Sequence, residues 1–103
     1  MLAGSLARRY AKALMQLGVD GRNFEALGAE LGRFARQVEG SPDLQVVLHS
    51  PIVPVSRRKA ILEEVLGKMA VSKTIHHFLQ LLVDQNRMNA LAGIEREYRA
   101  LVD

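Results

Sequence analysis

The segment of residues 5–17 is predicted to form a helix that is apolar over too much of its circumference for one core to cover. At about 100° per residue, its apolar side chains form two neighbouring stripes. One stripe consists of Leu6, Tyr10, Ala13 and Leu17, and the other of Ala7, Ala11 and Leu14. Together they cover roughly 160°, whereas an ordinary surface helix turns an arc of about 100° toward its core. One stripe can serve the core, and the other requires a partner.

Residues 72–86 show the same excess of apolar surface. Five side chains already fill one face of this segment, namely Ile75, Phe78, Leu79, Leu82 and Val83. Leu81 then widens the apolar arc to roughly 200°. By contrast, the apolar positions of residues 24–38 fit within about 100° and need nothing beyond their own core. Two over-wide helices in one small domain predict a surface groove that accepts a helix from another protein.

Residues typical of helix starts and ends divide the first half of the chain into three predicted helices. Ser5 is expected to cap the first helix, and Gly18 is expected to close it in the left-handed conformation. A second helix runs to about residue 39. Ser41 followed by Pro42 then starts a short third helix, because the missing N–H of proline is harmless at the first helical position. The prolines of residues 50–54 end that helix, since each one favours extended backbone before it.

The second half continues in the same way. Ser56 and Ser72 are expected to cap the fourth and fifth helices. A tight reversal around Asn86 leads to a final helix over residues 89–102, which we expect to turn Tyr98 and Leu101 inward. No segment alternates with the period of a strand for more than a few residues. The predicted fold class is therefore all-α, a single six-helix bundle with short connections.

Composition excludes several classes of protein. The 103 residues suffice for one domain that folds alone. The net charge of +3 is spread along the chain, which is typical of a solvated surface and argues against nucleic-acid binding. Because cysteine is absent, the chain has no disulfide, no thiolate metal site and no cysteine nucleophile. No apolar run approaches the length of about 18 residues that a membrane span requires.

Catalytic, cofactor and metal sites are not predicted. His76 and His77 are adjacent on one helix, so their side chains point about 100° apart and cannot share a metal ion. The glycines form neither a dinucleotide fingerprint nor a phosphate loop. Gly28 and Gly32 instead allow another helix of the bundle to approach closely. Glu95 is expected on a solvated face.

Basic residues gather in the first helix, at Arg8, Arg9 and Lys12. We place them on its polar side, opposite the wide apolar arc, where they form a solvated face or contact an acidic partner. The stretch before Gly18 is also typical of a mitochondrial presequence, because it has adjacent arginines and no acidic residue. The stop signal at Gly18 and the bundle-type apolar pattern favour a structural helix.

Three stretches of the chain resemble one known family, in the right order and spacing. They are residues 7–14 (ARRYAKAL), residues 50–54 (SPIVP), and residues 78–88 (FLQLLVDQNRM) with Ile94 and Tyr98 after them. These resemble the first helix, the mid-domain proline turn and the fifth-to-sixth helix segment of the delta subunit of bacterial F-type ATP synthases. The mitochondrial relative of that subunit is the oligomycin-sensitivity-conferring protein. Where the family usually has glycine in the last turn, this chain has Asn86, which visits the left-handed region readily.

The resemblance implies a fold and a function. Residues 1–103 would form the N-terminal helical-bundle domain, and the C-terminal domain of the family would lie outside this chain. The domain would be non-catalytic and would need no cofactor. It would bind the amphipathic N-terminal helix of an ATP synthase alpha subunit between helices one and five, while the absent domain would contact the stalk b subunit. The complex would place it peripherally on the cytoplasmic face of a bacterial cell membrane, with no direct membrane contact.

Six residues are expected to bind the partner helix. Tyr10, Ala13 and Leu81 match positions that the family uses for the alpha contact, and the helix geometry adds Leu6, Leu17 and Phe78. Each of the last three is equally compatible with an ordinary core position. An alternative function comes from another class, because the arginine-rich first helix also resembles RNA-binding antitermination factors of the NusB type. In that case Arg8, Arg9 and Lys12 would contact phosphates.

Overall fold

Helices make up most of the chain between residues 2 and 103, the part that the computed structural model describes, with side chains described from Gly4 onward. Within that part there are six α-helices and one short 3-10 helix, and no β-strand. Their bounds are α1 (Leu2–Asp20), α2 (Phe24–Glu39), α3 (Pro42–His49), α4 (Val55–Gly67), α5 (Lys73–Asp84), η1 (Met88–Ala90) and α6 (Leu91–Val102). The predicted all-α bundle is confirmed.

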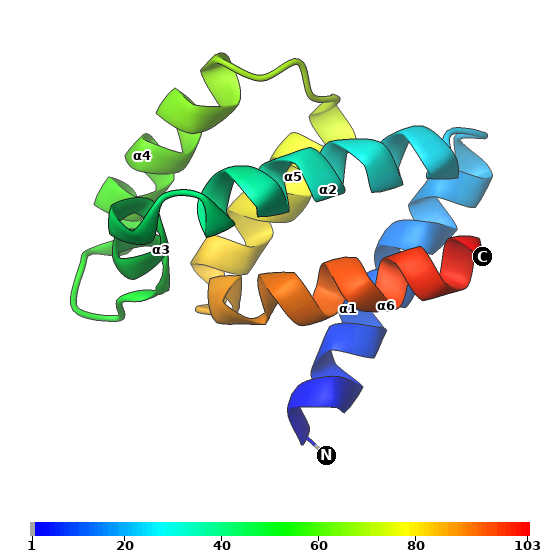
Figure 1. Cartoon of the computed structure of the whole chain (residues 1–103), viewed down its shortest axis with the longest axis horizontal. Coiled ribbons are helices and arrows are strands. Elements are labelled where there is room, and N and C mark those ends of the chain that lie inside the picture. The colour runs from blue at the N-terminus through cyan, green and yellow to red at the C-terminus, as the bar shows by residue number, and fades with distance from the viewer. Residues whose placement is uncertain (1) are drawn as a thin grey trace.

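The helices form two groups, α1 with α2 and α6, and α4 with α3 and α5 (Figure 1). Helix α6 crosses α1 and packs along α2, while α4 packs on α5, and α3 fills the end between α2 and α4. Helix α1 is not among the close backbone neighbours of α5 in the described part of the chain. The radius of gyration, 12.8 Å, is that of one compact domain of this length.

The core is built from the inward faces that the apolar periodicity indicates. Its largest fully buried side chains come from every α-helix, and include Leu14, Leu31, Phe34, Leu48, Leu62, Leu79, Leu82, Ile94 and Tyr98. The narrow stripe of α2 is covered by the core, apart from the half-buried Phe24 at its start. Of the two stripes of α1, the one of Ala7, Ala11 and Leu14 is buried. The second stripe is half-buried at Leu6 and Tyr10 and exposed at Ala13 and Leu17.

The two ends of α1 differ from the sequence expectation. The helix begins before Ser5 and continues through Gly18 to Asp20, so Ser5 is not its cap and Gly18 does not close it. Gly18 serves a different purpose, since a Cβ placed there would lie 2.6 Å from the Cα of Phe24. The missing side chain lets α2 start directly against α1. The left-handed residue of this connection is Arg22, with φ 58°.

The caps of the later helices are partly as expected. The hydroxyls of Ser41 and Ser72 accept the backbone N–H groups of Leu44 and Ile75, which confirms both as N-caps. The expected cap at Ser56 is wrong, because α4 begins one residue earlier and the carbonyl of Pro54 already accepts its first N–H groups.

Helix α6 turns two side chains of its last turns toward α2 and leaves a third outside. Tyr98 and Val102 lie against Gly28 of α2. Leu101 points away from them and is 42% exposed, so the expectation that it faces inward is wrong.

The reversal between α5 and η1 is tied to α4 by a buried arginine. Asn86 adopts φ 56°, the left-handed conformation expected of it. Its Oδ1 accepts a hydrogen bond of 2.8 Å from the guanidinium of Arg58, which also donates to the carbonyl of Val53 at 2.9 Å. Arg58 is only 2% exposed. One side chain therefore fixes the proline turn and the end of α5 together.

Candidate partner-binding groove

A groove of about 620 Å³ runs between α1 and α5. All six residues predicted to bind a partner line it: Leu6, Tyr10, Ala13, Leu17, Phe78 and Leu81. The remaining lining residues are Arg9, Leu14, Thr74, His77 and Gln85. The groove exists because α1 packs on α6 and α2 while α5 packs on α4 and α2, which leaves the second stripe of α1 and the Leu81 side of α5 accessible.

The predicted residues divide between groove wall and core. Leu17 and Leu81 are 53% and 41% exposed, and Ala13 is also exposed on the groove wall. Leu6 and Tyr10 are half-buried. Phe78 is nearly covered and packs with the core, so only a small part of its surface lines the groove. The apolar wall is therefore accessible to a partner, and whether a partner binds there stays a prediction.

Tyr10 joins the two helices that line the groove. Its ring meets that of Phe78 edge to face, with centroids 6.3 Å apart. Its hydroxyl donates a hydrogen bond to Oε1 of Gln85 at the end of α5. These contacts fix the ring, so the area that it offers to a partner is available without further loss of side-chain entropy.

The groove has a polar rim that the apolar pattern of the sequence did not predict. Arg9 belongs to it, and the expectation that Arg9 lies opposite the apolar arc is wrong. The signal was present, because Arg9 precedes Ala13 by four residues and so lies only about 40° from it around the helix. His77 occupies the other rim, on α5. Arg8 is turned away, toward Glu97 of α6 at 3.4 Å.

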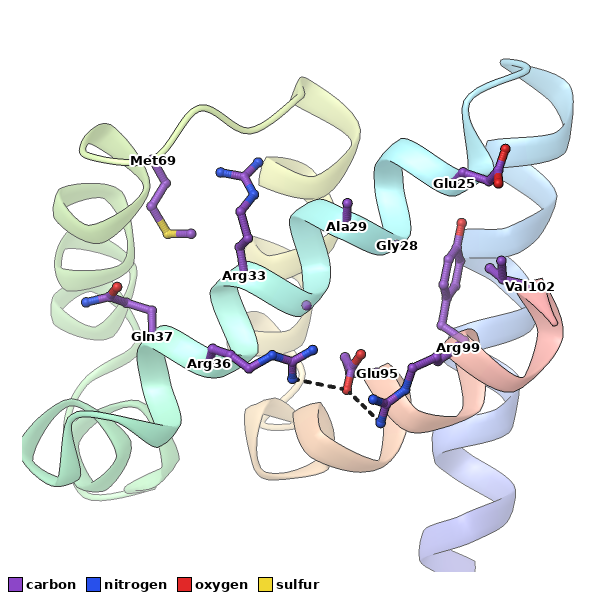
Figure 2. Close-up of a pocket in the computed structure, with 12 residues that line it drawn as sticks. Glu25, Gly28, Ala29, Arg33, Arg36, Gln37, Met69, Glu95, Arg99 and Val102 are labelled. Carbon is purple, nitrogen blue, oxygen red and sulfur yellow. Dashed lines mark ion pairs between the residues drawn. The ribbon is translucent and has the colours of Figure 1, made fainter.

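A second cavity, of about 710 Å³, lies between α2 and α6 (Figure 2). A Cβ on Gly28 would lie 2.9 Å from the ring of Tyr98, so the predicted close approach of a helix at this glycine is confirmed. The expectation that Glu95 is solvated is wrong, since it is 7% exposed. Arg36 and Arg99 approach its carboxylate at 3.7 and 3.4 Å and compensate for its burial.

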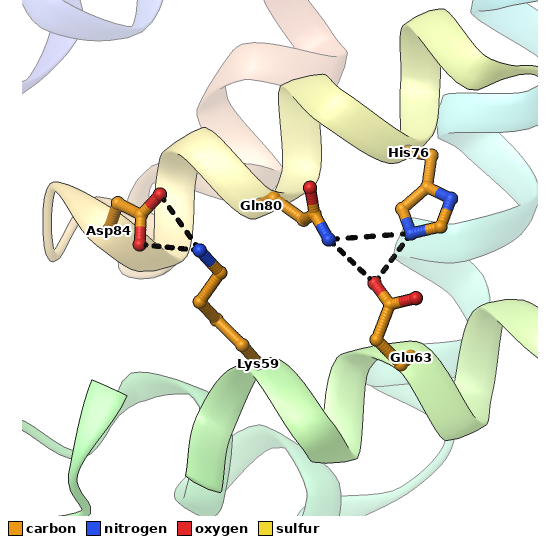
Figure 3. A network of polar contacts seen from close by, with 5 residues as sticks. All are labelled: Lys59, Glu63, His76, Gln80 and Asp84. Atoms are coloured by element: carbon orange, nitrogen blue, oxygen red, sulfur yellow. Dashed lines mark hydrogen bonds and ion pairs between the residues drawn. The ribbon is translucent and has the colours of Figure 1, made fainter. Parts of the chain in front are cut away.

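A polar network joins α4 to α5 through side chains that do not line the groove (Figure 3). Oε2 of Glu63 lies 2.5 Å from Nε2 of His76 and accepts a hydrogen bond of 2.8 Å from Gln80. The contact with His76 is the main reason that the pKa of Glu63 lies below its ordinary value. Lys59 pairs with Asp84 at 3.0 Å in the next turns. The network holds α5 on α4, so α5 presents a fixed wall to the groove.

The described residues hold no group of three or more histidine and acidic side chains placed for a metal ion. His49 is set apart from the other histidines, because burial lowers its pKa and its Nε2 has no hydrogen-bond partner. Among the helices described, none has the length and apolar character needed to cross a membrane. The groove between α1 and α5 is an accessible apolar surface of the bundle.

Comparison with known proteins identifies the family. The family model of the ATP synthase delta (OSCP) subunit matches residues 6–103. The chain belongs to this family. The resemblance drawn from the three sequence stretches is confirmed.

Individual delta subunits match over the whole of this chain. ATP synthase subunit delta of Geobacter metallireducens is 43% identical over 103 residues, which cover 57% of that protein. The corresponding subunits of Heliobacterium modesticaldum and Anaeromyxobacter sp. (strain Fw109-5) are 38% and 40% identical, with 55% and 58% of their lengths covered. The chain therefore spans a little over half the length of the curated relatives that it matches.

Proposed function

We propose that this delta-family domain is a non-catalytic part of the peripheral stalk of an F-type ATP synthase. In this role it binds the amphipathic N-terminal helix of an alpha subunit in the groove between α1 and α5. The observation that carries the proposal is the accessible apolar wall of Ala13, Leu17 and Leu81 in a member of this family. An exposed apolar wall between two helices is the surface that an amphipathic helix covers in helix-in-groove recognition.

The dimensions of the groove suit a short helix. Its wall on α1 extends from Leu6 to Leu17, which at 1.5 Å per residue is roughly 16 Å, or about three turns. An incoming helix would place apolar side chains at intervals of three and four residues against Leu81 and the accessible part of Phe78. Ala13 has the smallest side chain of the wall and would let the partner backbone approach most closely.

The mechanism is mechanical. The stator must keep the catalytic head from turning with the rotor, so a docking domain needs a stiff frame and a contact that resists torque. The frame of this domain is fixed by Arg58, which joins two turns, and by the network of Glu63 and His76, which holds α5. The stalk b subunit would be engaged by a further domain of the protein. Through the assembled complex the domain would sit on the cytoplasmic face of a bacterial membrane.

The test is a titration of the purified chain with a peptide of the alpha subunit's N-terminal segment. We expect Ala13→Asp to weaken binding by at least about tenfold, because a carboxylate in the apolar contact must be desolvated. Its melting temperature should change by only a few degrees, since Ala13 is exposed. The matched control is Ala60→Asp on the exposed surface of α4, which should bind like the unmodified chain.

Two results would contradict the proposal. Unchanged affinity of Ala13→Asp would show that the peptide binds elsewhere, and a collapse of the fold would show that this face belongs to the core. A short RNA serves as the comparison ligand, titrated at low and moderate salt. Binding of the RNA with a steep salt dependence, and no binding of the peptide, would favour the alternative nucleic-acid function.

A further inference from the structure

The charge of the groove rim is one-sided. Of the residues that line the groove, none is acidic, while Arg9 stands on the α1 rim and His77 on the α5 rim. The nearest acidic residues on both helices are engaged elsewhere. Asp20, at the end of α1, accepts a hydrogen bond from Gln16, and Asp84 of α5 pairs with Lys59 of α4. The positive charge of the α1 rim is therefore not neutralised by the groove itself.

We infer that the helix occupying this groove carries a carboxylate on the polar flank that lies against α1, where Arg9 receives it. This inference rests on the proposed function, because it specifies the chemistry of the partner for the same groove. The carboxylate selects among amphipathic helices that have the same apolar face. A basic flank would place like charges together, which disfavours the wrong partner.

The position of Arg9 supports this role. On α1 it lies about 40° from Ala13 and about 60° from Leu6, on the side away from the buried stripe. It therefore stands at the outer edge of the apolar wall, beside the line where the polar flank of a docked helix would pass. Its side chain is long enough to lie along the apolar wall with the guanidinium at the rim.

Arg9 is also available for a new contact. It is exposed, and within residues 4–103 it forms no ion pair and no side-chain hydrogen bond. Its neighbour Arg8 is already paired with Glu97. A carboxylate that arrives at Arg9 therefore breaks no existing interaction, and a guanidinium can hold it through two parallel hydrogen bonds. His77 offers a further N–H donor on the opposite rim.

The experiment is a double-mutant cycle with the alpha-subunit N-terminal peptide as probe. The peptide is used in its natural form and in a form whose flank carboxylates are replaced by carboxamides. We expect Arg9→Gln to weaken binding of the natural peptide about two- to fivefold, the size of a rim ion pair. The carboxamide peptide should bind the unmodified chain as weakly as the natural peptide binds Arg9→Gln. The affinity of the carboxamide peptide for Arg9→Gln should be no lower than its affinity for the unmodified chain. Added salt should lower the affinity of the unmodified chain more than that of Arg9→Gln.

Arg8→Gln is the matched control, because it removes the same charge from the next position of the same helix. It should leave the affinity for the natural peptide unchanged. Equal losses of affinity in Arg8→Gln and Arg9→Gln would overturn this inference and leave the proposed function standing. An affinity that changes neither with Arg9→Gln nor with the carboxamide peptide would have the same meaning. A natural peptide without a flank carboxylate that still binds tightly would do the same. No binding of the natural peptide to the unmodified chain would instead refute the proposed function.

Discussion

Replacing Asn86 by glycine tests whether the left-handed turn after α5 is held by its backbone or by its side chain. Glycine removes the cost of the positive φ at this residue, which is small because asparagine tolerates the left-handed region better than most residues. The same change removes the acceptor of the 2.8 Å hydrogen bond from Arg58. Arg58 is buried and forms no ion pair within residues 4–103, so two oxygens supply its compensation.

The hydrogen bond should decide the outcome. A hydrogen bond to a charged group contributes about 1.5–3 kcal/mol, and a buried donor without a partner costs the desolvation of that group. The relief of backbone strain offsets part of this loss. We therefore expect Asn86→Gly to lower the free energy of unfolding by about 1–2 kcal/mol. In a domain of this size the melting temperature should then fall by about 4–15 °C.

Arg22 supplies the control, because it has nearly the same φ, 58°, but is exposed and makes no side-chain hydrogen bond in the described part of the chain. Arg22→Gly relieves strain of about 1–2 kcal/mol and adds the conformational entropy cost of glycine, about 0.5–1 kcal/mol. It should therefore raise the stability slightly. Thermal and urea unfolding, followed by circular dichroism, measure both variants. If Asn86→Gly were as stable as the unmodified chain, the bond to Arg58 would contribute nothing and our reasoning would be wrong.

Two further predictions concern the helix frame of the groove. Gly18→Ala should destabilise the fold by about 1–3 kcal/mol, because its Cβ would lie 2.6 Å from the backbone of Phe24. The control is Gly67→Ala, whose added Cβ meets no atom within 4 Å and which should stabilise the fold by up to about 1 kcal/mol. If urea unfolding gave equal changes in the free energy of unfolding for both variants, packing would not matter at Gly18. Glu63→Gln should cost up to about 1 kcal/mol near neutral pH, since the contact with His76 is partly exposed. The pKa of Glu63 is lowered in the folded state, so this contribution is present above about pH 4.5 and is lost as the pH falls through the lower folded value. A stability difference between the two chains that persisted at pH 2 would contradict that assignment.

The order of the helices and the surplus of apolar surface on α1 and α5 follow from the sequence because they depend on local spacing. Tyr10 and Ala13 lie on the second stripe of α1 because of their spacing along the helix alone. Leu81 widens the apolar arc of α5 for the same reason. Serine before proline at residue 41 sets a helix start through its own hydroxyl and the proline ring. Such signals act within one or two turns, so they remain valid in the folded protein.

Errors arise where a distant segment determines the structure. Gly18 looks like a helix end, but α1 continues through it to Asp20, and the missing side chain leaves room for Phe24 instead. Glu95 looks solvated, but Arg36 and Arg99 close over it from two helices. Neither fact is encoded in the spacing of nearby residues.

The sequence by itself determined that this chain forms amphipathic helices with more apolar surface than its core can bury, because helical periodicity fixes which side chains share a face. Only the tertiary structure decided which stripe enters the core and that Arg9 and His77 stand at the rims of the groove. The physical reason is that the rotation of a helix about its axis is set by packing against its neighbours. On α1, the small side chains of Ala7 and Ala11 let α6 approach closely. The stripe that contains them therefore enters the core, and the stripe of Tyr10 and Ala13 is left at the groove.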